Sequence, residues 1–313
     1  MPAPFPPSTS VESLLRLVGS AEGLASIAAD LEVTAGVLSG GSSGDESGAD
    51  ANASAWLAPE GFSVLASLAE RARCAALIAA VDALAERHLP AVFVYAFDEP
   101  WVIGERIRRR ISALSGHDYR LVEDIWAWRI PPGSGGWPPH RGIADVLLDR
   151  EAPEILNVWV ALSDVTADRA CMHAVPLDDD PGYPEALARV DAPLESVRAL
   201  PVAAGDALVW NANVLHWGGR CAPRAAGARV SCSFTLCRAD AADRFPGLAL
   251  LGPLEILDLM ARLDVVARMV LLYGDADRGD VSATVRQWAN LTHELAARFG
   301  RGSEGPAGLR KAP

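Results

Sequence analysis

Lysine is almost absent from this chain of 313 residues. Lys311 is the only one, so the other 27 of the 28 basic residues are arginine. A P-loop needs a lysine on the phosphates of its nucleotide, and a Schiff-base enzyme needs a buried lysine amine. Residues 1–310 contain no lysine that could serve either chemistry. Basic residues are also outnumbered by 40 acidic ones, which gives a net charge of −12. This balance disfavours a nucleic-acid polymer as partner, because such a polymer is bound by a basic surface.

Paired cysteines and long apolar runs are lacking too. The five cysteines are an odd number without a CxxC pair, which is typical of reduced, buried thiols in a cytoplasmic protein. The first ten residues, MPAPFPPSTS, have neither the charged nor the apolar region of a signal peptide. The apolar runs are too short or too interrupted to cross a bilayer. We therefore expect a cytoplasmic protein that acts on a small molecule and does not enter a membrane.

Helical periodicity dominates both ends of the chain. It is present in residues 11–37, from about 59 to 87, in 100–114, and again after residue 253. The arginine-rich stretch 106–110 is typical of a solvated helix face, and its functional interpretation is a clamp for an anionic substrate group. The apolar run AVFVYAF (91–97) predicts a buried strand. Residues 39–54, SGGSSGDESGADANAS, have the composition of a flexible linker.

Short β-branched and aromatic runs fill the middle of the chain, separated by Gly, Pro and Asp. This texture predicts an antiparallel barrel or sandwich, here a double-stranded β-helix or jelly roll, with helices contributed by both ends. We expect one catalytic domain over 56–300 with its barrel core at about 118–240, preceded by a helix and linker (1–55) and followed by a tail (301–313). The runs lie at 119–130, 154–164, 170–176, 197–211 and 229–238.

Two of the six histidines stand in unusual surroundings. His140 follows a Gly/Pro loop in GGWPPHRG, and His216 ends the segment GDALVWNANVLH. Their separation of 76 residues places them on opposite parts of the expected barrel. Arg229 opens a predicted strand 13 residues after His216. Imidazole suits iron, and an arginine fork on a strand suits a carboxylate. The other histidines have plainer interpretations: His88 and His117 as solvated residues, and His293 as a surface or packing residue.

These segments resemble the phytanoyl-CoA dioxygenase-like branch of the Fe(II)/2-oxoglutarate oxygenases. The matching stretches are GWPPHRG, LNVWVALSDVTADRACMHAVP, GDALVWNANVLHWGG and RVSCSF, in the order of the family. The resemblance implies that His140 and His216 hold Fe(II) and that Arg229, with Ser231, binds the distal carboxylate of 2-oxoglutarate. It also implies that Trp159 packs near this cosubstrate. His173 falls in a strand that leads to a substrate-facing loop in the family.

One residue departs from the family pattern. The family has a His-x-Asp pair, but this chain reads His140-Arg141-Gly142, so the carboxylate ligand is missing. Residues i and i+2 of a strand share a face, so Gly142 points to where that ligand would be. Halogenases of this superfamily carry the same change, and chloride takes the open position. The resemblance therefore implies a chlorinase that uses Fe(II), 2-oxoglutarate, O2 and chloride on an unactivated C–H bond.

Alternatives stay open at this stage. In a hydroxylase of the same superfamily, Asp145 would replace the missing ligand through a strand bulge. In a non-catalytic, cupin-like binding protein, Gly142 would mark a lost active site. Asn211 or Asn213 is a candidate to hold the halide. The sequence restricts the substrate to a small molecule and leaves open an anionic one, such as a nucleotide or an amino acid. Asp178–Asp180 resemble a solvated loop more than a calcium site.

Overall fold

Two antiparallel sheets face one another in the computed structural model, which describes residues 10–34, 56–57, 60–251, 257–274 and 281–298. The larger sheet has the order β1-β6-β3-β8-β2 and the smaller one β5-β4-β7. The larger sheet comprises β1 (Phe62–Leu65), β2 (Tyr119–Ile130), β3 (Ile155–Ala161), β6 (Ala207–Asn211) and β8 (Arg229–Arg238). The smaller sheet comprises β4 (Met172–Ala174), β5 (Arg198–Leu200) and β7 (His216–Gly218).

The predicted fold class is confirmed. The protein is mainly antiparallel β-sheet with flanking helices, and its core is a jelly roll. β2 and β8 coincide with the predicted runs 119–130 and 229–238 and pair along most of their length. A register shift between Leu121 and Ile125 bends β2, and beyond it Trp126 and Trp128 point to the same face of the sheet.

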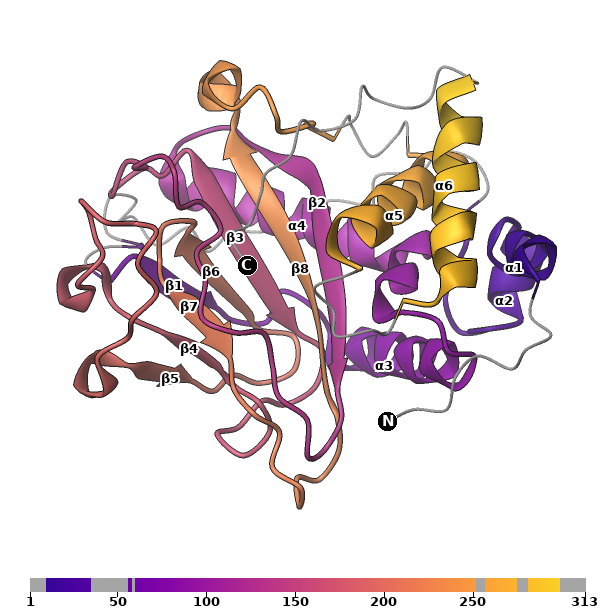
Figure 1. Ribbon diagram of the computed structural model, residues 1–313, viewed down its shortest axis with the longest axis horizontal. Coiled ribbons are helices and arrows are strands. Elements are labelled where there is room, and N and C mark those ends of the chain that lie inside the picture. The colour runs from indigo at the N-terminus through magenta and orange to yellow at the C-terminus, as the bar shows by residue number, and fades with distance from the viewer. Residues whose placement is uncertain (1–9, 35–55, 58–59, 252–256, 275–280, 299–313) are drawn as a thin grey trace.

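Helices pack against one side of the larger sheet, and the smaller sheet lies on its other side (Figure 1). Local sequence fixes several helix ends. Ser10 and Asp258 accept hydrogen bonds from backbone N–H groups in the first turns of α1 and α5, and Gly116 ends α4 in the left-handed conformation. The helices are α1 (Val11–Val18), α2 (Ala21–Ala25), α3 (Arg71–Glu86), α4 (Glu99–Ser115), α5 (Leu259–Tyr273) and α6 (Ala283–Arg298).

The two faces of the larger sheet bury different side chains because strand residues alternate between them. The outer face, under the helices, presents aliphatic and aromatic residues such as Val158, Val209 and Phe234. The inner face, toward the smaller sheet, presents Trp159, Leu208 and Trp210. It also carries the polar residues of β3 and β8 that line a pocket between the sheets. The candidate site is therefore built on the inner face.

Three element predictions need correction. The run 91–97 forms a buried 3-10 helix (Ala91–Ala96), because a short apolar run carries no period that separates helix from strand. The predicted helix from 59 to 87 begins with strand β1 before α3 starts at Arg71. The predicted helix over 11–37 is two short helices interrupted at Gly19 and Ser20. The linker 39–54 lies outside the described residues. Among the described helices, none combines the length and the hydropathy that a membrane span requires.

Candidate metal and cosubstrate site

His140 and His216 are direct neighbours. Their backbones form an antiparallel bridge with N–H to carbonyl distances of 3.0 Å in both directions, and their ring centroids are 4.3 Å apart. The expectation that they lie on opposite parts of the barrel is wrong. The segment that contains His140 runs alongside β7, so it reaches His216 although four strands, β3 to β6, come between the two residues in the chain.

Backbone carbonyls set the orientation of both imidazoles. Nδ1 of His140 lies 2.8 Å from the carbonyl oxygen of Pro138, and Nδ1 of His216 lies 2.9 Å from that of Val214. A carbonyl oxygen only accepts hydrogen bonds, so each Nδ1 is the protonated nitrogen. The lone pair of each neutral ring is then on Nε2, which is the arrangement of histidines that bind metals.

A buried ion pair fixes the backbone on both sides of this histidine pair. Arg141 follows His140 and donates to both carboxylate oxygens of Asp180, at 2.5 and 3.0 Å, with both side chains fully buried. It also donates to the carbonyl oxygens of Leu187 and Asn213, and Asn213 lies three residues before His216. The interpretation of Asp180 as part of a solvated loop is wrong. No local pattern marks Arg141, because its partners Asp180 and Asn213 lie 39 and 72 residues away in the chain.

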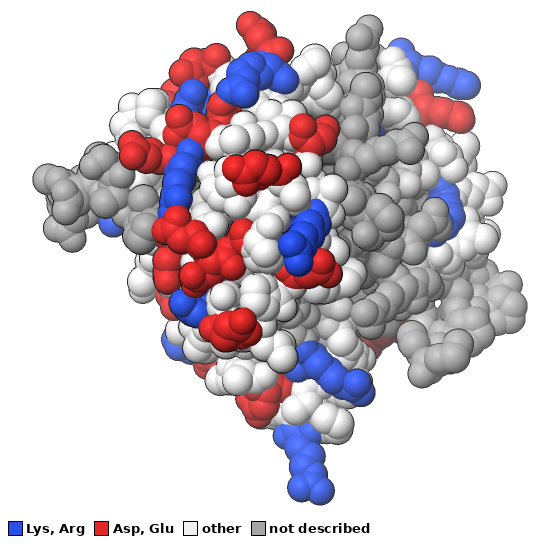
Figure 2. All heavy atoms as spheres, turned by 60° about the vertical axis from the view of Figure 1, so that its left-hand side comes forward, with Lys and Arg blue, Asp and Glu red and all other residues white. Residues whose placement is uncertain are grey.

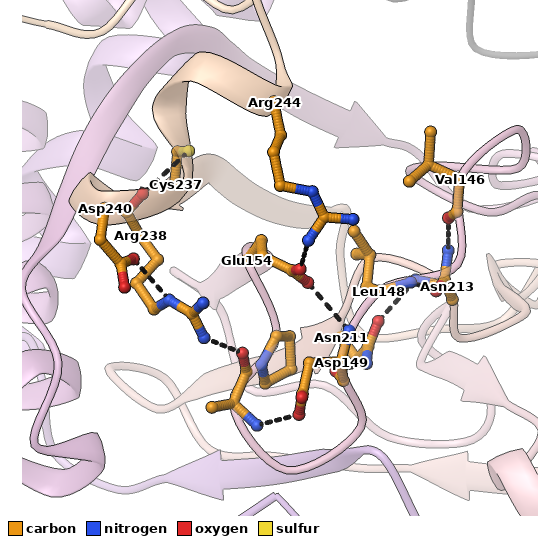
Figure 3. Close-up of polar contacts among 12 residues, drawn as sticks. Val146, Leu148, Asp149, Glu154, Asn211, Asn213, Cys237, Arg238, Asp240 and Arg244 are labelled. Carbon is orange, nitrogen blue, oxygen red and sulfur yellow. Dashed lines mark hydrogen bonds and ion pairs between the residues drawn. The ribbon is translucent and has the colours of Figure 1, made fainter.

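Asn211, the last residue of β6, and Asn213 form a second clamp on the segment around Leu148 (Figure 3). Asn211 donates to the carbonyl of Asp149, while Asn213 accepts from the backbone N–H of Leu148 and donates to the carbonyls of Ile143 and Val146. Both asparagines are fully buried, and neither lines the pocket. The suggestion that one of them holds a halide is therefore wrong, because their amides hold the loop after Gly142 in place.

The pocket between the sheets is rich in aromatic residues and hydrogen-bond donors. Trp126 and Trp128, which share one face of β2, both line it. Their indole N–H groups, and that of Trp210, are buried without a hydrogen-bond partner. No aspartate or glutamate is among the lining residues, which are Trp126, Trp128, Trp137, His140, Asn157, Val158, Trp159, Met172, Trp210, His216, Gly218, Arg229, Ser233, Phe234, Thr235 and Tyr273. A ligand for this pocket needs acceptor atoms.

Arg229 brings a buried positive charge into the pocket. Its side chain is 1% exposed and its Nε lacks a hydrogen-bond partner. Its guanidinium lies 5.2 Å from the ring centroid of Trp159 and contacts the sulfur of Met172 at 3.4 Å. Burial lowers the pKa of Arg229 to about 10. No ion pair joins it to a carboxylate in the described part of the chain. Because an unpaired buried cation is costly, this site calls for an anion.

The remaining predicted residues fall inside and outside the pocket. Ser231 is fully buried on β8 two residues after Arg229, and its hydroxyl lacks a partner, but it does not line the pocket. His173 stacks on Trp217, outside the pocket lining. Arg108 and Arg109, in the expected clamp of 106–110, pair with Glu105 on their own helix. They are therefore engaged locally and do not reach the pocket.

In the described part of the chain, no carboxylate lies beside the histidine pair to serve as a third metal ligand. Within the described ranges, no three His, Cys, Asp or Glu side chains are grouped so that they could hold a metal. Asp145 is exposed and does not line the pocket. Gly142 is buried, and a Cβ on it would lie 1.9 Å from Oδ1 of Asn157. The donor set available to a metal is thus two imidazoles with fixed tautomers and, near Gly142, an amide oxygen. This set fits Fe(II).

Comparison with known proteins finds similarity over part of the chain. Residues 111–223 match the family model of phytanoyl-CoA dioxygenase. Dioxygenase lolE1 of Epichloe uncinata is 27% identical over 149 residues, which are 45% of this chain, and the chain spans about half (52%) of that curated relative. The match covers the segment with both histidines and ends before Arg229.

Solved structures of similar fold include AviO1 from Streptomyces viridochromogenes Tue57, at 16% identity and a TM-score of 0.47, with 59% of this chain and 92% of that one covered. The non-heme monooxygenase ThoJ gives 17% identity and a TM-score of 0.47, with 78% of this chain and all of that one covered. HygX from Streptomyces hygroscopicus, with nickel and 2-oxoglutarate bound, gives 15% identity and a TM-score of 0.42, with 58% and 84% covered.

Proposed function

We propose that this protein is an Fe(II)/2-oxoglutarate-dependent oxygenase that oxidises a C–H bond of a small molecule. The observation that carries the proposal is Arg229, a buried and unpaired cation in the same acid-free pocket as the oriented pair His140 and His216. A dicarboxylate would fit both the unpaired arginine and the histidine pair, because one carboxylate neutralises the arginine while the other end approaches the metal. The match of residues 111–223 to the phytanoyl-CoA dioxygenase family supports it.

Each residue has a defined task in this proposal. His140 and His216 would hold Fe(II) through Nε2, while the carbonyls of Pro138 and Val214 keep Nδ1 protonated. Arg229 would bind the distal carboxylate of 2-oxoglutarate, with Trp159 packed against its guanidinium. Bound iron, with 2-oxoglutarate and O2, would supply the oxidising power for C–H cleavage. The tryptophans of the pocket would exclude bulk water and donate hydrogen bonds to acceptor atoms of the ligands.

Chlorination is a second candidate outcome, and Gly142 favours it. The residue that would carry the third protein ligand in the family has no side chain. In this version of the proposal a chloride ion takes the open position and restores the negative charge that the missing carboxylate would supply. Hydroxylation instead requires a neutral or external third ligand. Chloride dependence and product mass separate these two outcomes, and a binding protein without turnover would consume no 2-oxoglutarate.

The surface agrees with a small-molecule partner. Figure 2 brings the side of the smaller sheet forward, and acidic side chains gather there with arginines between them. Exposed arginines in and before β5 are engaged in ion pairs, Arg198 with Asp179 and Arg189 with Asp191. Such a surface repels polyanions and gives no basic track for a nucleic acid. We propose that the substrate itself enters the tryptophan-lined pocket, and that it is small and rich in acceptor atoms.

The decisive experiment is an anaerobic titration of the protein with Fe(II) and 2-oxoglutarate, with and without chloride. We expect a metal-to-ligand charge-transfer absorption in the visible range that requires both additions. A shift of this absorption on adding chloride, absent with sulfate at equal ionic strength, would support chlorination. An absorption indifferent to chloride would support oxygen transfer. If no absorption forms under any condition, the proposal is wrong and the fold serves another purpose.

A further inference from the structure

Asn157 occupies the space that the missing carboxylate leaves. It lies in β3, where its register partners are Trp210 on one side and Thr235 on the other, and it lines the same pocket as both histidines. Its Oδ1 lies 1.9 Å from the point where a Cβ on residue 142 would be, and its Cγ lies 3.0 Å from that point. A side chain at residue 142 and the present conformation of Asn157 therefore exclude each other.

A chain of hydrogen bonds determines which end of the amide faces the pocket. Tyr273 and Thr235 donate their hydroxyl hydrogens to the two oxygens of Asp124, at 2.6 and 2.8 Å. Since the Thr235 hydroxyl hydrogen is committed to Asp124, its oxygen accepts from Nδ2 of Asn157, at 3.0 Å. The amide nitrogen thus points toward β8, and Oδ1 points toward Gly142. This assignment follows from the network rather than from the amide alone.

Oδ1 of Asn157 is buried and has no hydrogen-bond partner. A buried acceptor without a donor costs free energy comparable to a lost hydrogen bond, so such an atom in a pocket marks a ligand. The ligand must be a cation or a donor, because an amide oxygen carries partial negative charge. A halide is an anion and would be repelled at this point, whereas a metal ion accepts amide oxygens as ligands.

We propose that Asn157 is the third protein ligand of the metal site, replacing the carboxylate that Gly142 lacks. This inference rests on the proposed Fe(II) function and refines it. Two imidazoles and one amide form a neutral ligand set, in contrast to the singly negative set of two histidines and a carboxylate. The neutral set holds the metal less tightly and takes the place where chloride would bind. Oxygen transfer, rather than chlorination, is then the reaction that the site supports.

Thr235 acts as a positioning residue in this arrangement. Its hydroxyl accepts from Asn157 and donates to Asp124, and this fixes the orientation of the amide. Loss of its hydroxyl would let the amide rotate without removing the oxygen. A Thr235→Val variant should therefore weaken metal binding by less than Asn157→Ala does, since only the orientation of the ligand is lost.

The test measures Co(II) binding by the metal-free protein, using calorimetry and visible absorption without cosubstrate. We expect Asn157→Ala to weaken binding about 10- to 100-fold and Asn157→Asp to strengthen it at least tenfold, because a carboxylate restores the negative ligand. Thr235→Val should weaken it about threefold. Asn290→Ala, an exposed asparagine on α6, should leave it unchanged. Circular dichroism checks that each variant folds.

Two failures are distinguishable. If the unaltered protein binds Co(II) and His140→Ala abolishes binding, but Asn157→Ala and Asn157→Asp both bind as the unaltered protein does, the inference about Asn157 is overturned and the proposed function stands. If the unaltered protein shows no binding that depends on His140, the proposed function fails and the inference fails with it. Should Asn157→Ala not fold, the strengthening expected of Asn157→Asp alone decides, and unchanged or weaker binding counts against the inference.

Discussion

The two faces of the larger sheet differ in whether their buried polar atoms have partners. The outer face and the helices on it bury several charges, and these are paired: Arg262 with Asp98, and Arg268 with Glu123 and Asp264. On the inner side, six buried side-chain atoms lack a hydrogen-bond partner. They belong to Trp126, Trp128, Asn157, Trp210, Arg229 and Ser231. Only two other residues of the described chain, His173 and Arg262, have such an atom.

This difference separates a scaffold from a binding site. Buried polar groups in stable cores find partners, because leaving one unpaired costs about 1–3 kcal/mol. Several unpaired groups on one face can be tolerated when bound ligands supply the missing hydrogen-bond partners. Five of the six atoms are donors, or in the case of Ser231 can act as one, which matches a dicarboxylate and other acceptor-rich molecules. The scaffold behind this face supplies the stability that the site lacks.

The largest effect concerns the histidine pair. His140→Ala or His216→Ala should abolish Fe(II) binding and turnover, because each removes one of two imidazole ligands with a fixed tautomer. His173→Ala is the matched control, since His173 is half-buried beside Trp217 and lies outside the pocket. Equilibrium binding of Fe(II) under anaerobic conditions measures all three. Unaltered iron affinity in either pocket variant would remove that histidine from the site.

The next effect concerns the cosubstrate. Arg229→Ala should weaken 2-oxoglutarate binding about 100-fold or more, because it removes the buried cation that faces the carboxylate. Arg224→Ala should change it less than twofold, since Arg224 is exposed in the loop before β8. Titration of the charge-transfer absorption with 2-oxoglutarate at saturating Fe(II) gives both affinities. The reverse order of effects would assign the carboxylate to Arg224.

Much of this comparison is visible in the sequence, and some of it is not. The alternation of apolar residues in 119–130 and 229–238 fixes which side chains share a face, so Trp126 with Trp128 and Arg229 with Ser231 are predictable. The absence of a carboxylate after His140 is visible in the same way. Contacts between distant segments leave no such trace. The burial of Asp180 against Arg141, and the approach of Asn157 to Gly142, depend on how loops and strands meet.

The adjacency of His140 and His216 shows the same limit. Spacing along the chain placed them apart, but sheet topology brings them into one antiparallel bridge. The run 91–97 illustrates a different limit, because its residues are buried on all sides and carry no period that separates strand from helix. Local pattern therefore predicted the strands of the core, while the positions of the pocket side chains relative to one another required the folded chain.

The smallest expected effect is a change in stability, and its sign should differ between a buried arginine of the inner face and one of the outer face. Arg229 and Arg262 are both buried arginines, but Arg262 donates to Asp98 and to the carbonyl of Thr34, whereas Arg229 has no carboxylate partner in the described chain. Burial lowers the pKa of both arginines, but Asp98 opposes this for Arg262, whereas no carboxylate opposes it for Arg229, so folding disfavours the charged form of Arg229. That cost is present at every pH below the folded pKa of about 10 and fades only as the pH rises further. It therefore applies in full at neutral pH.

Replacing Arg229 by methionine should consequently stabilise the ligand-free protein by about 1 kcal/mol, or raise Tm by roughly 2–4 °C at pH 7. Arg262→Met should do the opposite and cost about 3–5 kcal/mol, because it leaves Asp98 buried without its cation. Adding 2-oxoglutarate to the Co(II)-loaded protein should raise the Tm of the unaltered protein further, but should not raise that of Co(II)-loaded Arg229→Met. Thermal unfolding followed by circular dichroism measures each shift. A fall in Tm for ligand-free Arg229→Met would mean that Arg229 is a structural residue of the inner face, and the contrast between the two faces would not extend to it.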